Sequence, residues 1–355
     1  MRRYRNRILV GFAIVFVIYV GLLLFVNTEE LVANLRAYPW HLFIPVVLLK
    51  LVAWVLRFGQ WQYYLGVIGA RNKISVFDSI VIFLSGFTMA VSPGKIAEVL
   101  KSVILKVKTG IPVARSAPVV IAERVVDGVA VVVVVLLVTL VAGDNIQLGA
   151  YGILIVISGA LLGLGLIAVQ VRPLAYFLLD SCARLPLVKR VHRPLVEFYE
   201  SSREILSLRH IFPTTVMGSA AHLADAFGFT LVLTGFGLEL TWTLYLQATV
   251  IVGLSAAVGA LSGLPNGAGV TEVSTSAALL AIVAPQNPVM TQSAALAAAL
   301  IEGFFHKWFR VFTGLLVAVI FRRRLFPPAL ETAIEEMETE RTQKQAAYSI
   351  EGSQP

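Results

Sequence analysis

The sequence has little charge for its length and almost no cysteine. Asp, Glu, Lys and Arg make up only 14% of its 355 residues, whereas hydrophobic residues make up 57%. A water-soluble domain needs more polar surface than this, so the composition excludes an ordinary soluble protein and predicts an integral membrane protein. The single cysteine, Cys182, excludes an internal disulfide, and we expect it to be an inert thiol.

The sequence also lacks the patterns of several functional classes. Its net charge of +8 comes from Lys and Arg in short segments between apolar runs, without the aromatic-studded basic groove of a nucleic-acid-binding protein. The segment Ser92-Pro93-Gly94-Lys95 does not have the spacing of a P-loop, and no βαβ pattern surrounds residues 263–269. No catalytic nucleophile set stands out, so we expect no enzyme, no cofactor and no nucleic-acid partner.

Six apolar runs are long enough to cross a bilayer, which takes about 20 residues. Arginines precede the first run and follow the last, and cytoplasmic segments carry the excess of positive charge. We therefore expect both termini in the cytoplasm and the chain in the cell inner (plasma) membrane. The first run is interpreted as an uncleaved helix, because no small-residue cleavage site follows it. The six runs cover residues 8–26, 40–58, 118–141, 149–170, 211–236 and 290–320.

Two further apolar stretches are predicted to be re-entrant helical hairpins. Lys and Arg lie on both sides of residues 76–105, so this stretch should enter from the cytoplasm and return, with a break at Ser92-Pro93-Gly94. The alternative, a full span at 76–95, would place Lys101, Lys106, Lys108 and Arg115 outside. Residues 243–284, broken at 263–269, are flanked by loops without Lys or Arg and should enter from the exterior.

The predicted fold class is therefore an all-α polytopic membrane protein with about six full spans and two re-entrant hairpins. Residues 1–326 form one transmembrane domain, in which repeat 1 (about 40–141) and repeat 2 (about 211–320) have opposite topology. Residues 171–210 form a cytoplasmic linker with a helical pattern, and 327–355 form a polar cytoplasmic tail. Inverted repeats with broken helices at matching positions are typical of transporters whose site lies near the midplane.

Candidate site residues in the first half lie at the hairpin tip and on the following span. Ser92 fits a helix N-cap and Pro93 the first helical position, which places Lys95 at the positive end of a half-helix. The anion near Lys95 could be Glu98 or a substrate phosphate. Charges within a span face the bundle interior and serve either structure or function. The candidates are Ser92, Pro93, Gly94, Lys95, Glu98, Glu123, Arg124 and Asp127.

The second half offers a matching set. Glu302, His306 and Arg310 are spaced four apart on the last span, a stripe that suggests a proton relay or an anion clamp. His222, Asp225, Glu302 and His306 could supply metal ligands, but no metal motif is present, so we expect no metal. The candidates are His222, Asp225, Pro265, Asn266, Gly267, Gly269, Glu272, Glu302, His306 and Arg310. Trp54, Arg57 and Trp61 are interpreted as an anchor at the membrane interface.

The motifs resemble a bacterial and archaeal flippase-like family, which includes the transmembrane domain of lysylphosphatidylglycerol synthases. The matching elements are Trp61 to Leu65 with Gly69, the Ser92-to-Lys95 tip with Glu98 and Lys101, Glu123-Arg124 with Asp127, and the Pro265-to-Gly269 tip with Glu272. The resemblance implies transfer of an anionic, aminoacylated or polyprenyl-phosphate lipid between leaflets. The large acyltransferase domain of the synthases is not expected here, because a tail of roughly 30 residues follows.

Three functional hypotheses follow from these patterns. The first is a lipid flippase whose partners are membrane lipids and possible lipid-modifying or glycan-assembly enzymes. The second is a proton-coupled transporter of a small soluble anion built on the same repeat. The third and weakest is an intramembrane enzyme acting on a lipid phosphate. A groove open to the bilayer would favour the first, and a closed aqueous vestibule the second.

Overall fold

The computed structural model describes residues 17, 19–21, 27–89, 100–143, 150–183 and 192–325, and this part of the chain is helical without a strand. Several predictions lie outside the described residues. They concern most of the first span (8–26), the tail 327–355, and the tip residues Ser92, Pro93, Gly94, Lys95 and Glu98. The predicted all-α polytopic fold class is confirmed.

Six helices of the described part are long and apolar enough to cross a membrane. Five of them coincide with the predicted spans from 40–58 onward. The sixth, Trp242–Leu261, is expected from the sequence to be half of a hairpin, but its 20 residues make it about 30 Å long. The six are Trp40–Val67, Val113–Ala142, Gly152–Gln170, Leu208–Thr234, Trp242–Leu261 and Gln292–Ile320.

Large apolar side chains cover the outside of these helices. On α3 (Phe43–Val67), Ile44 and Val55 are each more than half exposed, and on α7 (Ala150–Gln170) only 6% of the most apolar window is buried. Apolar side chains in such numbers are stable at a surface only when lipid covers it. The protein is therefore embedded in a membrane.

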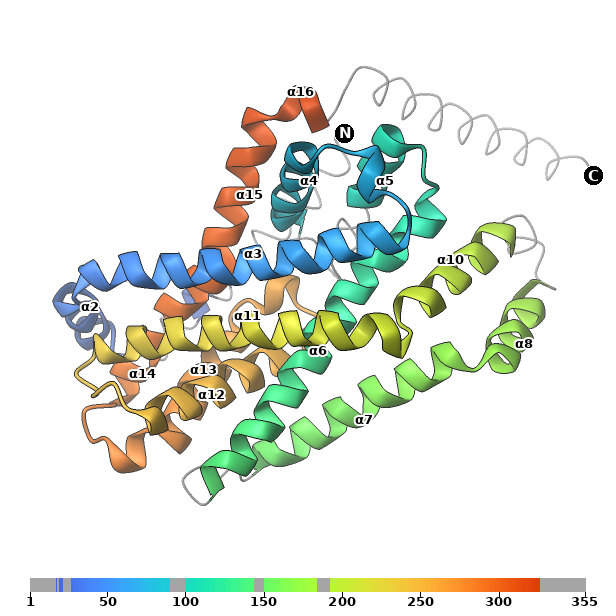
Figure 1. Ribbon diagram of the computed structural model, residues 1–355. Helices are drawn as coiled ribbons and strands as arrows, with labels where there is room; N and C mark the ends of the chain where they lie inside the picture. The colour runs from blue at the N-terminus through green and yellow to red at the C-terminus, as the bar shows by residue number, and fades with distance from the viewer. Residues whose placement is uncertain are drawn as a thin grey trace, which may run out of the picture.

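The centre of the molecule is a pair of long helices. In Figure 1, α3 lies beside α11 (Leu208–Thr234) along most of its length, and α6 (Val113–Ala142) crosses against both of them. The interior between them is apolar, with Val46, Phe229 and Val126 fully buried. This packing fixes the helix faces that carry the buried charges described below.

The first predicted hairpin consists of two short helices. Helix α4 (Val76–Met89) and helix α5 (Leu100–Thr109) pack together, and Asp78 at the start of α4 lies 3.3 Å from the Nζ of Lys108 at the end of α5. Asp78 also lies 3.4 Å from Arg324 of α16 (Arg322–Leu325), which follows the last span. The open ends of the hairpin therefore lie together with the end of the last span.

The second hairpin has one long and one short arm. Helix α12 (Trp242–Leu261) packs against α13 (Val270–Ile282), and the side chain of Gln247 donates to the carbonyl oxygen of Ile282 at 3.2 Å. Asn266, Gly267 and Gly269 at the tip all have positive φ, which glycine and asparagine adopt most readily. The tip therefore forms at the predicted sequence.

The last span is divided into three pieces. Helix α14 (Gln292–Gly303) continues through a π-helical turn (Phe304–Trp308) into α15 (Phe309–Ile320), and α15 packs against α4. π-Turns inside helices are rare and are frequent at functional sites. Figure 1 shows α15 rising at a steep angle to α3 and α11.

The segments outside the spans contain helices of their own. Between the first two predicted spans lies helix α2 (Thr28–Ala37), whose N-cap Asn27 accepts from the backbone of Glu29 and Glu30. The linker contains α8 (Arg172–Ala183) and α10 (His192–Ile205). The hydroxyl of Tyr176 donates to Glu200 at 2.6 Å and lowers the pKa of that carboxyl. Helix α10 packs on α6, and Ile205 near its end is fully buried.

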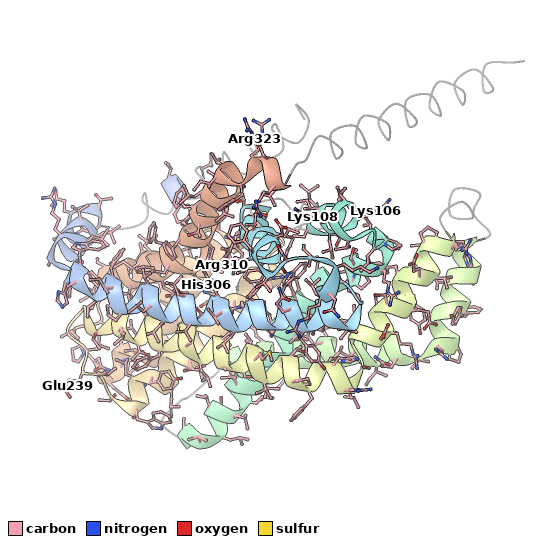
Figure 2. All side chains as sticks on the ribbon, turned by 45° about the horizontal axis from the view of Figure 1, so that its top comes forward. Lys106, Lys108, Glu239, His306, Arg310 and Arg323 are labelled. Carbon is pink, nitrogen blue, oxygen red and sulfur yellow. The ribbon has the colours of Figure 1, made fainter. Side chains whose placement is uncertain are left out.

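Charge is distributed unevenly between the two ends of the molecule. Figure 2 shows Lys106, Lys108 and Arg323 toward one end, Glu239 at the opposite end, and His306 and Arg310 between them. The cationic end is the one predicted to be cytoplasmic.

We expect Lys106→Cys and Arg323→Cys to react with a membrane-impermeant maleimide from one side only, and Glu239→Cys from the other. All three side chains are exposed, and the changes are made in a Cys182→Ser background, which removes the single native cysteine. Labelling of Lys106→Cys and Glu239→Cys from the same side would rule out the hairpin topology of α4 and α5.

Candidate functional site

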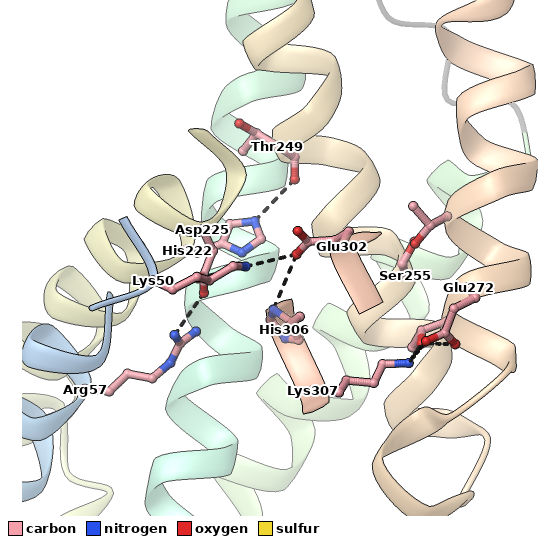
Figure 3. Close-up of polar contacts among 12 residues, drawn as sticks. Lys50, Arg57, His222, Asp225, Thr249, Ser255, Glu272, Glu302, His306 and Lys307 are labelled. Carbon is pink, nitrogen blue, oxygen red and sulfur yellow. Dashed lines mark hydrogen bonds and ion pairs between the residues drawn. The ribbon is translucent and has the colours of Figure 1, made fainter. Parts of the chain in front are cut away.

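A lysine in the middle of α3 anchors a network of buried charges. Lys50 is only 1% exposed, and its Nζ lies 3.2 Å from Oδ1 of Asp225 on α11 and 3.0 Å from Oε1 of Glu302 on α14 (Figure 3). A buried cation needs such partners, because an unpaired charge inside a membrane protein is costly. Lys50 therefore ties three helices together.

Arg57 extends this network along the same face of α3, two turns further on. Its Nη1 donates to Oδ2 of Asp225 at 2.9 Å, and its Nε lies 3.7 Å from Oδ1 of Asp127 on α6. Asp127 in turn lies 3.4 Å from Arg124. We call this continuous series the ionic chain. Its members are Glu302, Lys50, Asp225, Arg57, Asp127 and Arg124.

Two further buried ion pairs flank the ionic chain. Lys101 of α5 lies 2.8 Å from Glu123 of α6, and its stem packs over Gly86, where a Cβ would lie 2.8 Å from it. Lys307 of the π-turn lies 2.7 Å from Glu272 near the start of α13. Each pair thus joins the second arm of a hairpin to the span that follows it.

The tip of the second hairpin holds Glu272 in place. One oxygen of Glu272 accepts from the backbone N–H of Gly269 at 2.8 Å, and the other from the hydroxyl of Tyr19 at 2.6 Å. Lys307 also contacts the hydroxyl of Thr271 and the carbonyl of Gly267. Gly303 makes room for this contact, because any side chain there would collide with the Glu272 carboxylate.

A first cavity, which we call the arginine cavity, lies where α3, α4, α5, α6 and α15 meet. Four of its lining side chains are cations and two are carboxylates, and the guanidinium of Arg310 lies 4.5 Å from the centre of the Phe87 ring. Within the described residues, no carboxylate pairs with Arg310. The lining residues are Arg57, Gln60, Phe83, Gly86, Phe87, Lys101, Glu123, Arg124, Asp127 and Arg310.

A second cavity, the Glu302 cavity, lies between α12, α13 and the π-turn. Its walls carry two carboxylates, a histidine, a lysine and several hydroxyls. Its volume of about 40 Å³ suits a few water molecules at most. The lining residues are Val252, Ser255, Ala256, Thr271, Glu272, Thr275, Ala299, Glu302, Gly303, His306 and Lys307.

The structure brings most of the described candidate residues together. Glu123, Arg124 and Asp127 share the arginine cavity, and a spacing of four predicts a common helix face for Glu123 and Asp127. Glu272, Glu302 and His306 share the Glu302 cavity, and Asp225 bridges Lys50 and Arg57. His222 lines neither cavity, but it lies one turn before Asp225 on α11, and its Nε2 lies 3.3 Å from the carbonyl oxygen of Thr249 on α12 (Figure 3).

Of the predicted stripe of Glu302, His306 and Arg310, only Glu302 and His306 lie together in the structure. His306 Nδ1 lies 3.7 Å from Glu302 Oε1, but Arg310 lines the arginine cavity instead. The π-turn is the physical reason, since it widens the helix and rotates the residues that follow it. Nothing in the residue spacing marks this turn.

The interpretation of Trp54, Arg57 and Trp61 as an interfacial anchor is wrong. Both tryptophans are buried, at 6% and 1% exposure, and Arg57 belongs to the ionic chain. The reason is that α3 continues to Val67, so Arg57 lies in the middle of the helix and not at its end.

Sequence reasoning missed the central lysine. Lys50 lies inside the apolar run 40–58, and an ionisable residue within a span is a functional signal by itself. For Lys101 the sequence predicts a cytoplasmic position and a place in the family pattern but not its partner, because its pairing with Glu123 follows from the packing of α5 on α6. Among the described residues, no group of three His, Cys, Asp or Glu side chains could hold a metal ion.

We expect Lys101→Met to lower the free energy of unfolding by about 3–5 kcal/mol, because Glu123 would remain buried without a counter-charge. Lys101→Met combined with Glu123→Gln should recover most of that loss. Lys106→Met is the matched control, since Lys106 lies on the same helix and is exposed. Denaturation in detergent, followed by tryptophan fluorescence, measures the effect. Equal losses in the single and double variants would show that the pair does not interact.

Residues 8–314 match the profile of the family described as Lysylphosphatidylglycerol synthase TM region. A comparison with curated proteins found no significant match. The match covers both cavities and the whole ionic chain, and it confirms the resemblance inferred from the motifs. The chain therefore belongs to the family of the lysylphosphatidylglycerol synthase transmembrane region.

Proposed function

We propose that the protein is a lipid transporter of the flippase type, which moves a phosphate-bearing anionic lipid between the two leaflets. The observation that carries this proposal is the arginine cavity, and above all Arg310, a cation without a carboxylate partner in the described part of the chain. The family, whose description concerns a lipid-modifying synthase, supports a role in lipid handling.

The side chains around the arginine cavity have an excess of positive charge that one negative charge on a ligand would balance. Its lining has four cations, namely Arg57, Lys101, Arg124 and Arg310, and two carboxylates. Asp225, which pairs with Arg57 from outside the lining, makes a third carboxylate. Cations thus exceed carboxylates by one. A phosphodiester carries one negative charge, and arginine binds phosphate oxygens in a bidentate manner.

The position of the cavity along the helices supports transfer across the bilayer. Arg57, Asp127 and Asp225 each lie in the middle part of a long helix, and not near its ends. Transporters commonly bind their cargo near the midplane between two repeats. A head group held there is equally distant from both leaflets.

On this proposal, the structure corresponds to a closed state. The free volume in the arginine cavity is about 10 Å³, which is about one water molecule. A phosphate group therefore needs α4, α5 or α15 to move before it can enter. The π-turn before α15 is a natural place for such a movement, because its hydrogen bonds are already irregular.

The helix packing supports the predicted inverted repeat. Helix α4 packs on α15 of the second half, and α12 packs on α6 of the first half. In both halves, the second hairpin arm forms a buried ion pair with the following span. We propose that the hairpins are re-entrant, that the termini are cytoplasmic, and that the membrane is the inner (plasma) membrane.

The alternatives of the sequence analysis are a soluble-anion transporter and an intramembrane enzyme. We favour lipid because the matching family is described by a lipid-modifying synthase. We favour transport over catalysis because the site offers bound charges and no activated nucleophile among the described residues. Membrane lipids are the proposed partners.

We expect Arg310→Gln to reduce the transfer of NBD-labelled phosphatidylglycerol by about tenfold or more, because a charged hydrogen bond contributes about 1.5–3 kcal/mol. Dithionite bleaching of proteoliposomes measures how fast the lipid becomes accessible. Arg323→Gln is the matched control, because Arg323 is an exposed arginine on α16. Unchanged transfer in Arg310→Gln, with correct folding shown by gel filtration, would contradict the proposal.

A flux assay separates lipid from soluble cargo. We expect wild-type proteoliposomes to move labelled phosphatidylglycerol but not to accumulate radioactive inorganic phosphate. The reverse result would favour the soluble-anion transporter. Release of phosphate or of the lipid tail from the labelled lipid would show an enzyme.

A further inference from the structure

We propose that the Glu302 carboxylate is a proton-binding site, and that the ionic chain couples it to anion binding in the arginine cavity. The existence of the proton site is independent of the proposed function. Only its coupling to lipid transfer rests on that function.

The two oxygens of Glu302 have unequal surroundings. Oε1 accepts from Lys50 at 3.0 Å and lies 3.7 Å from His306 Nδ1, whereas Oε2 is buried without a hydrogen-bond partner. The side chain of Glu302 is only 8% exposed. An unpartnered carboxylate oxygen in such a place is costly, and a bound proton lowers that cost because a neutral carboxylic acid is easier to bury than a carboxylate. The geometry therefore offers Oε2 as the atom that takes the proton.

The cavity beside Glu302 is lined by groups of the kind that relay protons. Its walls include the hydroxyls of Ser255 and Thr275, which bond to each other at 2.9 Å. His306 also lines the cavity, with about a third of its side chain exposed (Figure 3). Histidine and hydroxyl groups are the usual members of proton pathways in membrane proteins.

The charged groups around Glu302 come from five elements, and most of them are already paired. Lys50 is shared with Asp225, and Lys307 is held by Glu272. Besides Lys50, His306 is therefore the titratable group that faces the Glu302 carboxylate directly. The groups that act on Glu302 and His306 are Lys50 and Arg57 from α3, Asp225 from α11, Lys307 from the π-turn and Arg310 from α15, and Glu272 from α13 in turn holds Lys307.

Protonation of Glu302 changes the charge that reaches the arginine cavity. A neutral Glu302 leaves Lys50 with Asp225 as its single counter-charge. Asp225 then has less negative charge to share with Arg57, which lines the arginine cavity. One added proton raises the charge of the network by one unit and favours one bound anion. Because linkage is reciprocal, a bound anion also favours the proton, which is the basis of co-transport.

Infrared difference spectroscopy of the purified protein tests the proton site without any transport assay. Wild type should show the carbonyl stretch of a buried carboxylic acid at low pH, and that band should disappear as the pH rises. Glu302→Gln should lack the band, and Glu302→Asp should restore it at a shifted position. If no titrating band depends on residue 302, the proton site is ruled out.

The same measurement distinguishes a proton from a metal cation. The titration should be the same in sodium and in choline buffers. If sodium alone moves the titration to lower pH, the cavity binds sodium in competition with protons, and a site specific for protons is overturned.

Binding of short-chain phosphatidylglycerol tests the coupling. In wild type, the Kd should rise by about fivefold or more between low and high pH, the lower range of typical couplings between sites. In Glu302→Gln, which is permanently neutral, the Kd should stay low at every pH. If the infrared band titrates but the Kd stays the same at every pH, the coupling is refuted and the proton site at Glu302 remains. Absence of lipid binding would refute both the coupling and the proposed cargo.

Discussion

The whole structure depends on one constraint, which is that a charge buried in a membrane protein must have a partner. Lys50 is nearly inaccessible, and Asp225 and Glu302 match it from two other helices. These three residues fix how α3, α11 and α14 approach one another. The same rule makes Arg310 informative, because it is the cation of the arginine cavity that the described carboxylates do not match.

The sequence predicts the parts of the fold that depend on composition and charge bias. Helices α6, α7 and α11 follow from runs of apolar residues, and the gathering of Lys106 and Arg323 at one end follows from the positive-inside rule. The sequence does not reveal where a helix continues past an apolar run. Helix α3 extends to Val67 through polar residues, so Arg57 belongs to the interior and not to the membrane interface.

The site is predictable as a set of residue types but not as a geometry. Spacing of four places Glu123 beside Asp127 and Glu302 beside His306, as observed. Pairs between distant helices, such as Lys50 with Glu302 or Lys101 with Glu123, depend on tertiary packing and have no local pattern. The ionic chain joins Glu302 in one cavity lining to Arg57 in the other through pairs of this kind, and for this reason the relation of the two cavities emerges only in three dimensions.

The π-turn at Phe304–Trp308 makes the position of Arg310 sensitive to the number of residues in the last span. It holds one residue more than an ordinary helical turn, and each residue of an α-helix advances the chain by about 100° around the axis. Loss of a single residue there would swing Arg310 away from Phe87 while leaving Glu302 beside Lys50. Evolution can therefore exchange side chains in this turn more easily than it can change their number.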